Sequence, residues 1–193
     1  ILVNEIEGAD VPKGELWVWP LGGASICVRS SDALIYIDPY TGSPTEGPWI
    51  RMVAVPYDPA DLRRVDAVFS THDHDDHCHE ATLRPIGENT LAPFIGPASS
   101  VHKMHDFGLP TERIIEAVDG QEFVFGDMTV RAVGILDHSD PTSLGWLVSA
   151  DDGPTLLDAG DSMYGTHFST IAEVAAGAGH GIDAATLSVA DMA

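Results

Sequence analysis

The stretch from Thr71 to His77, Thr-His-Asp-His-Asp-Asp-His, restricts what this chain can fold into more than any other part of it. Six of its seven side chains can bind a metal ion or a proton. The preceding residues 65–70 form a short apolar run with β-branched and aromatic side chains, which predicts a buried strand. We therefore expect the polar stretch in a loop at the carboxyl end of a strand, where α/β proteins place their chemistry.

The spacing within this loop predicts metal ligands. In an extended loop, residues two apart face the same side, so His72 and His74 can share one ion. Asp76 and His77 are adjacent and are expected to diverge, which lets them serve a second ion beside the first. Imidazole nitrogen and carboxylate oxygen suit zinc first, and manganese or iron next. The competing interpretation is a solvated surface loop that binds metal adventitiously, and the density of ligands directly after a strand argues against it.

The rest of the chain alternates short strands with helices, and its 193 residues fit one domain. Beyond the strand at 65–70, strands are predicted over residues 15–19, 26–29, 33–37, 91–95, 114–118, 122–125, 128–133, 145–149, 155–158 and 182–189. Helices are predicted over residues 78–86, 99–107 and 166–176. This interleaving predicts an α/β layered domain over residues 1–193.

Composition narrows the classes of partner. The chain has 30 acidic and 9 basic residues, a net charge of −21, which repels phosphate backbones and argues against nucleic-acid binding. No apolar run approaches the roughly 20 residues that span a bilayer, so no membrane partner is expected. Two cysteines, Cys27 and Cys78, do not make a disulfide framework. Cys78 follows His77 directly, but we interpret it as a small residue that starts the next helix. These features favour a cytoplasmic protein.

The loop also carries a resemblance. His72-x-His74-x-Asp76-His77 resembles the signature of the metallo-β-lactamase superfamily. Further stretches resemble its L-ascorbate-6-phosphate lactonase-like branch, and they run through nearly the whole chain: residues 19–25, 37–39, 66–77, 93–97, 108–113 and 159–162. The resemblance implies a four-layer αβ/βα sandwich, the metallo-β-lactamase fold, with a two-metal site between its two sheets.

The resemblance also implies a ligand set for two divalent ions, Zn²⁺ or Mn²⁺. Three histidines are expected on the first ion, two loop residues on the second, and one carboxylate on both: His72, His74 and His138; Asp76 and His77; and Asp161. Asp38, in an Asp-Pro pair after a strand, is expected to lie near the site and to support it without ligating.

Two positions depart from the family pattern. The family supplies one more histidine to the second ion, well downstream, and His167 and His180 both fall too early for it. We therefore expect a chain that is incomplete at its C-terminus. The lactonase carries a histidine where this chain has Met163, so the substrate is expected to differ from ascorbate phosphate.

Together these features predict a metal-dependent hydrolase. A metal-bound hydroxide would open a lactone or related ester, with a sugar phosphate as one option, and Asp76 would orient the nucleophile and carry its proton as the catalytic residue. Two alternatives stay open: a phosphodiesterase or nuclease with the same dinuclear site, and a non-catalytic metal-binding protein. The expected partner is a small-molecule substrate, and a homo-oligomer is left open.

Overall fold

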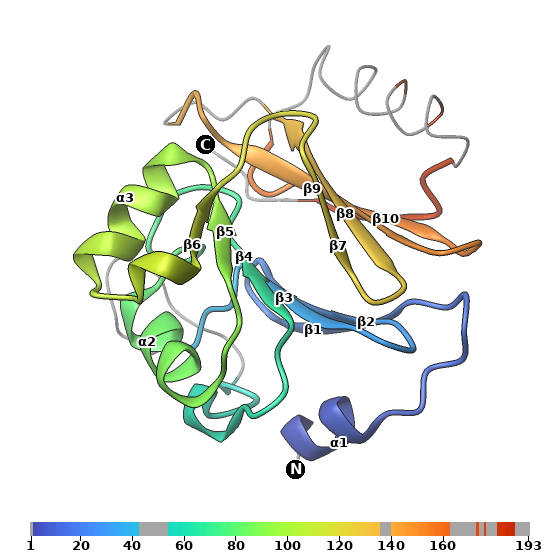
Figure 1. The fold of residues 1–193 in the computed structure, drawn as a ribbon, viewed down its shortest axis with the longest axis horizontal. Helices are drawn as coiled ribbons and strands as arrows, with labels where there is room; N and C mark the ends of the chain where they lie inside the picture. Colours follow the sequence, from blue (N-terminus) through green and yellow to red (C-terminus); the bar gives the residue numbers. More distant parts are fainter. Residues whose placement is uncertain are drawn as a thin grey trace.

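Two β-sheets face each other across a buried core in the computed structural model of the chain (Figure 1). The structure describes residues 2–42, 54–135, 140–162, 173, 176 and 181–187. Secondary structure alternates along the chain as the sequence predicts, with strands in both halves and helices between them.

In the part of the chain that the structure describes, the first sheet has six strands in chain order: β1 (Trp17–Gly22), β2 (Ser25–Arg29), β3 (Leu34–Ile37), β4 (Ala67–Phe69), β5 (Phe94–Gly96) and β6 (Ile114–Glu116). Strands β1 to β3 are antiparallel neighbours, whereas β3 to β6 pair in parallel. The carboxyl ends of β3, β4 and β5 therefore lie at one edge, and the loops that follow them are neighbours.

Within the described residues, the second sheet has five strands: β7 (Glu122–Phe125), β8 (Met128–Gly134), β9 (Leu144–Ala150), β10 (Thr155–Asp158) and β11 (Ala184–Thr186). Their order in space is β11-β10-β9-β8-β7. Neighbours are antiparallel except for β10 and β11, which are parallel.

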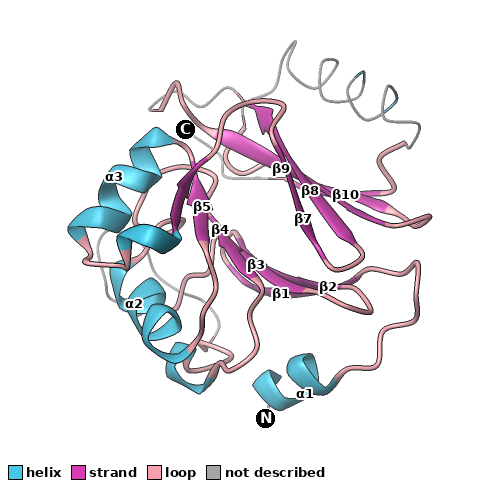
Figure 2. Ribbon diagram, viewed as in Figure 1, coloured by secondary structure: helices cyan, strands magenta, loops and turns pink. Residues whose placement is uncertain are grey.

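Helices pack on the face of the first sheet that points away from the second. Those that the structure describes are α1 (Leu2–Gly8), α2 (Glu80–Asn89) and α3 (Ala98–Asp106), together with the short 3₁₀ turns η1 (Pro59–Asp61) and η2 (Thr111–Arg113). Figure 2 shows α2 and α3 side by side along the outer face of this sheet. Among the residues that the structure describes, no helix has the length and apolar character that crossing a membrane requires.

Strand β3 shows how the sequence separates the two cores. Its side chains alternate: Leu34 and Tyr36 pack with the helices, whereas Ile35 and Ile37 pack toward the second sheet. Trp146 of β9 is fully buried between the sheets, 4.7 Å from the ring of Phe69 on β4. The loop that follows β4 is thus anchored to a strand that is buried on both faces.

The two facing sheets with helices outside the first confirm the predicted αβ/βα sandwich. Strand positions agree with the prediction to within a few residues, and the hairpin strands β7 and β10 agree residue for residue. Helix α1 was not predicted. The predicted helix over 166–176 lies outside the described residues apart from two helical positions, Glu173 and Ala176. The single domain over 1–193 stays a prediction.

Candidate metal centre

The candidate centre lies where strands of both sheets end. Asp38 follows β3, and the loop from Ser70 to His77 follows its parallel neighbour β4. The backbone N–H of Asp38 donates to the carbonyl oxygen of Phe69 at 2.9 Å, which extends the pairing of the two strands to the first polar residue. From the second sheet, β10 ends at Asp158 and leads to Gly160 and Asp161.

The ligand loop, residues 71–77, ends in a tight turn. The backbone N–H groups of His77 and Cys78 donate to the carbonyl oxygen of His74 at 3.0 and 2.8 Å. Because of this turn, Asp76 and His77 do not diverge as the sequence suggested: Asp76 Oδ2 lies 3.7 Å from His77 Nε2. The turn also delays helix α2, which begins at Glu80 and not at Cys78.

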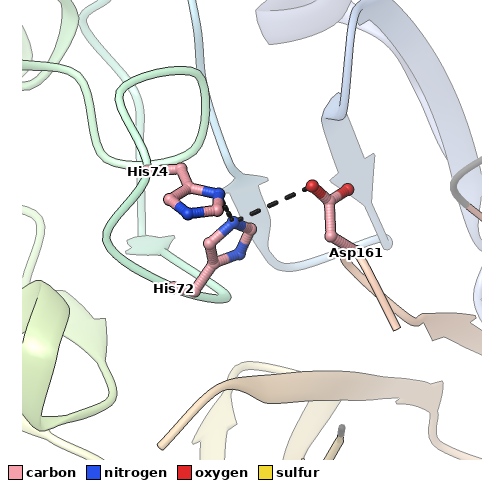
Figure 3. A group of neighbouring side chains, drawn as sticks. All are labelled: His72, His74 and Asp161. Atoms are coloured by element: carbon pink, nitrogen blue, oxygen red, sulfur yellow. Dashed lines mark hydrogen bonds and ion pairs between the residues drawn. The ribbon is translucent and has the colours of Figure 1, made fainter. Parts of the chain in front are cut away.

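Three potential ligands meet in a first group (Figure 3). His72 Nε2 lies 2.8 Å from His74 Nδ1, and Asp161 approaches His72 from the end of β10, with its Oδ2 3.9 Å from Nε2. One ligand atom from each of His72, His74 and Asp161 lies within 4.8 Å of the others. Two imidazole nitrogens and a carboxylate oxygen so close together are a donor set that fits a divalent transition-metal ion.

A glycine allows this approach. Gly160, next to Asp161, has a φ of +49°, a backbone conformation that residues other than glycine rarely adopt. A Cβ atom at this position would lie 2.9 Å from Cβ of Thr71, so a larger residue would push the end of β10 away from the ligand loop. Gly160 thus brings a carboxylate of the second sheet to histidines of the first.

His77 contributes a second group around the same carboxylate. Its Nε2 lies 3.5 Å from Asp161 Oδ2, the oxygen that also faces His72 Nε2. His77 is almost fully buried, with 1% of its side chain exposed, whereas Asp76 is about one-third exposed at 30%. Asp161 therefore stands between the two histidines as a shared ligand would.

Asp38 and Thr71 bond to each other and to ring nitrogens of the buried histidines. Asp38 accepts the backbone N–H of Thr71 at Oδ1, 2.8 Å, and the Thr71 hydroxyl at Oδ2, 2.7 Å. Its Oδ2 is also 2.7 Å from His77 Nδ1. If Nδ1 carries the proton, His77 presents a lone pair at Nε2 toward Asp161, which is the usual arrangement for a ligand histidine. Asp38 is fully buried and has φ of +47°.

The pKa values of the two buried histidines move in opposite directions. Burial and the charge of His77 hold the pKa of His72 below its ordinary value. Burial also lowers the pKa of His77, but the charge of Asp38 and hydrogen bonds to Asp161 and Asp38 outweigh it, and the pKa rises well above its ordinary value. His72 therefore stays neutral and keeps the lone pair of one ring nitrogen, whereas the metal-free chain favours the protonated form of His77, whose Nε2 must lose its proton before it can bind a metal ion.

A further carboxylate, Asp158, is buried at the end of β10. It accepts the hydroxyl of Thr186 at 2.6 Å and the N–H of Gly160 at 3.1 Å. Burial and the charge of Asp38 raise the pKa of Asp158 to about 7. Negative charge is therefore concentrated behind the histidines, as a site for cations requires.

The predicted ligand His138 lies outside the described residues and stays a prediction. Met163, His167 and His180, the positions at which the chain departs from the family pattern, lie outside them too. Cys78, which directly follows His77 in the sequence, is buried among the helices, and burial raises the pKa of its thiol to about 12, so it is a core residue. A further histidine, His102, is exposed on α3, with Nε2 3.8 Å from Asp106 Oδ2.

Sequence reasoning missed Thr71 as a functional residue. Its hydroxyl contacts Asp38 and lies 3.0 Å from His72 Nδ1, and its carbonyl oxygen accepts the N–H of Leu144 at 2.9 Å. It thereby ties the ligand loop to β9 of the second sheet. A hydroxyl residue directly before the first histidine was visible in the sequence, but its partners are distant in the chain.

Known proteins resemble this chain over most of its length. A sequence profile described as a beta-lactamase superfamily domain matches residues 34–189. The probable L-ascorbate-6-phosphate lactonase UlaG of Escherichia coli O45:K1 is 27% identical over 211 residues, which covers 87% of this chain and 60% of the relative. The chain therefore spans about 60% of the length of the curated relatives it matches.

Solved structures agree on the fold. Igni18, a metallo hydrolase from Ignicoccus hospitalis, superposes with a TM-score of 0.62 at 19% identity and covers 82% of this chain and 66% of its own. CmlA, a diiron beta-hydroxylase from Streptomyces venezuelae, gives a TM-score of 0.60 at 24% identity and covers 85% of this chain and 33% of its own. At these identities the likeness supports the fold alone, and the fold serves more than one chemistry.

Proposed function

The chain belongs to the beta-lactamase superfamily, and on that premise we propose that it is a metal-dependent hydrolase that opens a lactone or a related ester of a small molecule. The observation that carries this proposal is the position of Asp161, whose Oδ2 faces Nε2 of both His72 and His77. A carboxylate between two imidazoles at the meeting edge of two sheets fits a pair of divalent ions.

Each ligand has a separate part in the proposal. His72 and His74, with His138, would hold one ion, and Asp76 and His77 would hold the other, with Asp161 as a ligand to both. A bound divalent ion supplies Lewis acidity and lowers the pKa of a coordinated water toward neutrality. Asp76 is the catalytic residue: its carboxylate lies at the exposed side of His77, where it can orient the attacking water and take its proton. Asp38 keeps His77 in one orientation.

The proposed substrate class rests on the relatives, several of which carry the name of a probable lactonase of a sugar-acid phosphate. Arginine side chains are the usual partners of a substrate phosphate, and those of this chain give little support for a phosphate group on the substrate. Arg63 and Arg64 bond through their guanidinium groups to backbone carbonyls, and Arg84 pairs with Glu80 on α2. Arg51 lies outside the described residues. A lactone or ester carbonyl is thus the better supported part of the substrate.

We propose zinc or manganese as the native metal and a cytoplasmic location. The histidine-rich donor set favours zinc, and the carboxylates Asp76 and Asp161 also suit manganese. Because a structural neighbour is a diiron enzyme, iron is the comparison that any metal assay needs.

The experiment is a metal-resolved assay. The metal-free chain is loaded with zinc, manganese or iron(II), its metal content is measured by mass spectrometry, and hydrolysis of a γ-lactone is compared with that of bis(p-nitrophenyl) phosphate. We expect up to two equivalents of metal, and lactone hydrolysis with zinc or manganese. Turnover of the phosphodiester alone would favour the phosphodiesterase alternative. Bound metal without turnover of either would favour the non-catalytic alternative.

A further inference from the structure

Lys103 on helix α3 contacts the ligand loop at two points. Its ammonium nitrogen Nζ lies 2.6 Å from the carbonyl oxygen of Asp73 and 2.6 Å from the carboxylate oxygen Oδ1 of Asp75. The side chain of Lys103 is 23% exposed, so most of it is covered by its neighbours. The chain has only two lysines, and the other is Lys13.

The two acceptors have a particular place in the sequence. Asp73 lies between His72 and His74, and Asp75 lies between His74 and Asp76. Lys103 therefore binds the two positions that alternate with the potential ligands. The contact uses the backbone carbonyl of Asp73 and the carboxylate of Asp75, neither of which is among the proposed ligand atoms, so it acts on the loop without competing for the metal.

The charges of the loop favour this contact. Asp73, Asp75 and Asp76 bring three carboxylates into four residues, and Asp161 adds another from β10. Like charges at this spacing repel one another and favour an opened loop. One ammonium group that bonds both a backbone carbonyl and a carboxylate offsets part of this repulsion, and it restricts the loop at two points.

Helix α3 is a firm base for such a contact. Its Met104 is fully buried in the core between the helices and the first sheet. Its Ser100 packs so closely on Gly96 of β5 that a Cβ added to this glycine would lie 2.9 Å from Cβ of Ser100. The ammonium of Lys103 also lies 5.9 Å from the ring centre of Phe107. The Lys103 side chain thus joins the loop to an element whose own position is fixed by packing.

We propose that Lys103 is a positioning residue that holds the ligand loop in its metal-binding conformation. This inference rests on the proposed metal site at His72 and His74. Lys103 does not ligate, and it acts through Asp73 and Asp75. Without the Lys103 side chain the loop is less restrained, so the free energy of metal binding must also cover the ordering of the loop.

The test compares K103M with K13M. Both remove one positive charge, but Lys13 is exposed beside Asp151 and Asp152, lining a surface hollow at the outer side of the second sheet. Zinc affinity is measured by competition with a chelating dye, and unfolding of the metal-free chain is followed by circular dichroism. We expect K103M to bind zinc roughly 10-fold more weakly or worse, by analogy with other supporting partners of ligands, and K13M to bind like the wild type.

Two further variants keep the inference falsifiable. K103R should recover most of the affinity, and D75N, which leaves the Asp73 carbonyl contact, should lose less than K103M. If K103M does not fold, D75N takes its place and must still weaken zinc binding relative to K13M.

Three outcomes would overturn the proposal. Unchanged zinc affinity with a lower unfolding temperature would make Lys103 merely structural, and equal losses in K103M and K13M would make the effect one of overall charge. A wild-type chain that binds no zinc would reject the metal site itself, and this inference with it.

Discussion

Two buried aspartates lie at opposite ends of β3 and have different neighbours. Asp127, in the turn between β7 and β8, accepts from neutral donors of the turn between β2 and β3: the hydroxyls of Ser30 and Ser31 and the backbone N–H of Asp32. Asp38 bonds Thr71 and the imidazole of His77. Both carboxylates are at most 5% exposed, so burial does not distinguish them.

Their electrostatic surroundings do. Burial raises the pKa of Asp127, but hydrogen bonds from Ser30 and Ser31 and from backbone N–H groups bring it below the ordinary value. Around Asp38, the pKa of His77 is raised, and that of Asp158 is raised to about 7. At one end of β3 a charge is satisfied by neutral donors, and at the other several charges share one space. The second arrangement is typical of a functional site, the first of a structural clamp.

The largest expected effect comes from removing a ligand at the charged end. His74→Ala should abolish hydrolysis and remove the first metal, while the fold stays intact because His74 is exposed on the loop. The measurements are metal content by mass spectrometry and lactone hydrolysis, with His105→Ala on the exposed face of α3 as the matched control. Hydrolysis that persists in His74→Ala would reject the ligand assignment.

Asp38→Asn should act next most strongly, and on the metal. An amide can still accept the Thr71 N–H, but it removes the negative charge beside His77 Nδ1. We expect zinc affinity to fall roughly 10- to 100-fold, the usual effect of losing a partner of a ligand histidine. Chelator competition measures it, and Asp127→Asn is the control that should leave zinc affinity unchanged. Equal zinc affinity in both variants would remove the distinction between the two aspartates.

Asp127→Asn should instead reduce stability. The substitution replaces one carboxylate oxygen by an NH₂ group, which cannot accept a hydrogen bond from a serine hydroxyl. We therefore expect a loss of about 1–3 kcal/mol in the free energy of unfolding. Because its pKa is lowered in the folded chain, the ionised form contributes stability above the ordinary aspartate value of 3.8, which is lost as the pH falls through the folded pKa. Urea unfolding at pH 7 and pH 3 should therefore give a smaller difference from the wild type at pH 3.

How much of this comparison could be predicted from sequence depends on the distance between partners in the chain. The ligand loop was predictable because His72, His74, Asp76 and His77 are neighbours and follow an apolar strand. The fold followed from the alternation of strands and helices and from the resemblance. The structure keeps the predicted position of the ligand loop because strand β4 fixes the residue at which the loop begins.

Contacts between distant residues could not be derived in the same way. Thr71 and Asp38 are 33 positions apart, and Lys103 and Asp75 are 28 apart, so their meeting depends on strand order and helix packing. The side chains of Asp76 and His77 lie close together because of a turn, and no single residue of the sequence predicts that turn. Asp127 was seen only as part of a hairpin turn, and its serine partners lie 96 and 97 positions away.

Asp158 gives a pH effect whose sign is opposite to that of Asp127. Its pKa of about 7 in the folded chain exceeds the ordinary 3.8, so between these values the folded chain retains a proton that the unfolded chain has lost. Stability of the metal-free chain should therefore fall as the pH rises through this window, by a few kcal/mol at most, at about 1.36 kcal/mol per pKa unit.

Asp158→Asn removes this titration and keeps an acceptor for the Gly160 N–H. Its stability relative to the wild type should rise from pH 4 to pH 8, as measured by urea unfolding with a chelator present. A parallel pH dependence in the two chains would mean that Asp158 is ionised at little cost. In that case the negative charge behind the histidines would be less concentrated than the geometry indicates. The electrostatic difference between the two ends of β3 would then be smaller as well.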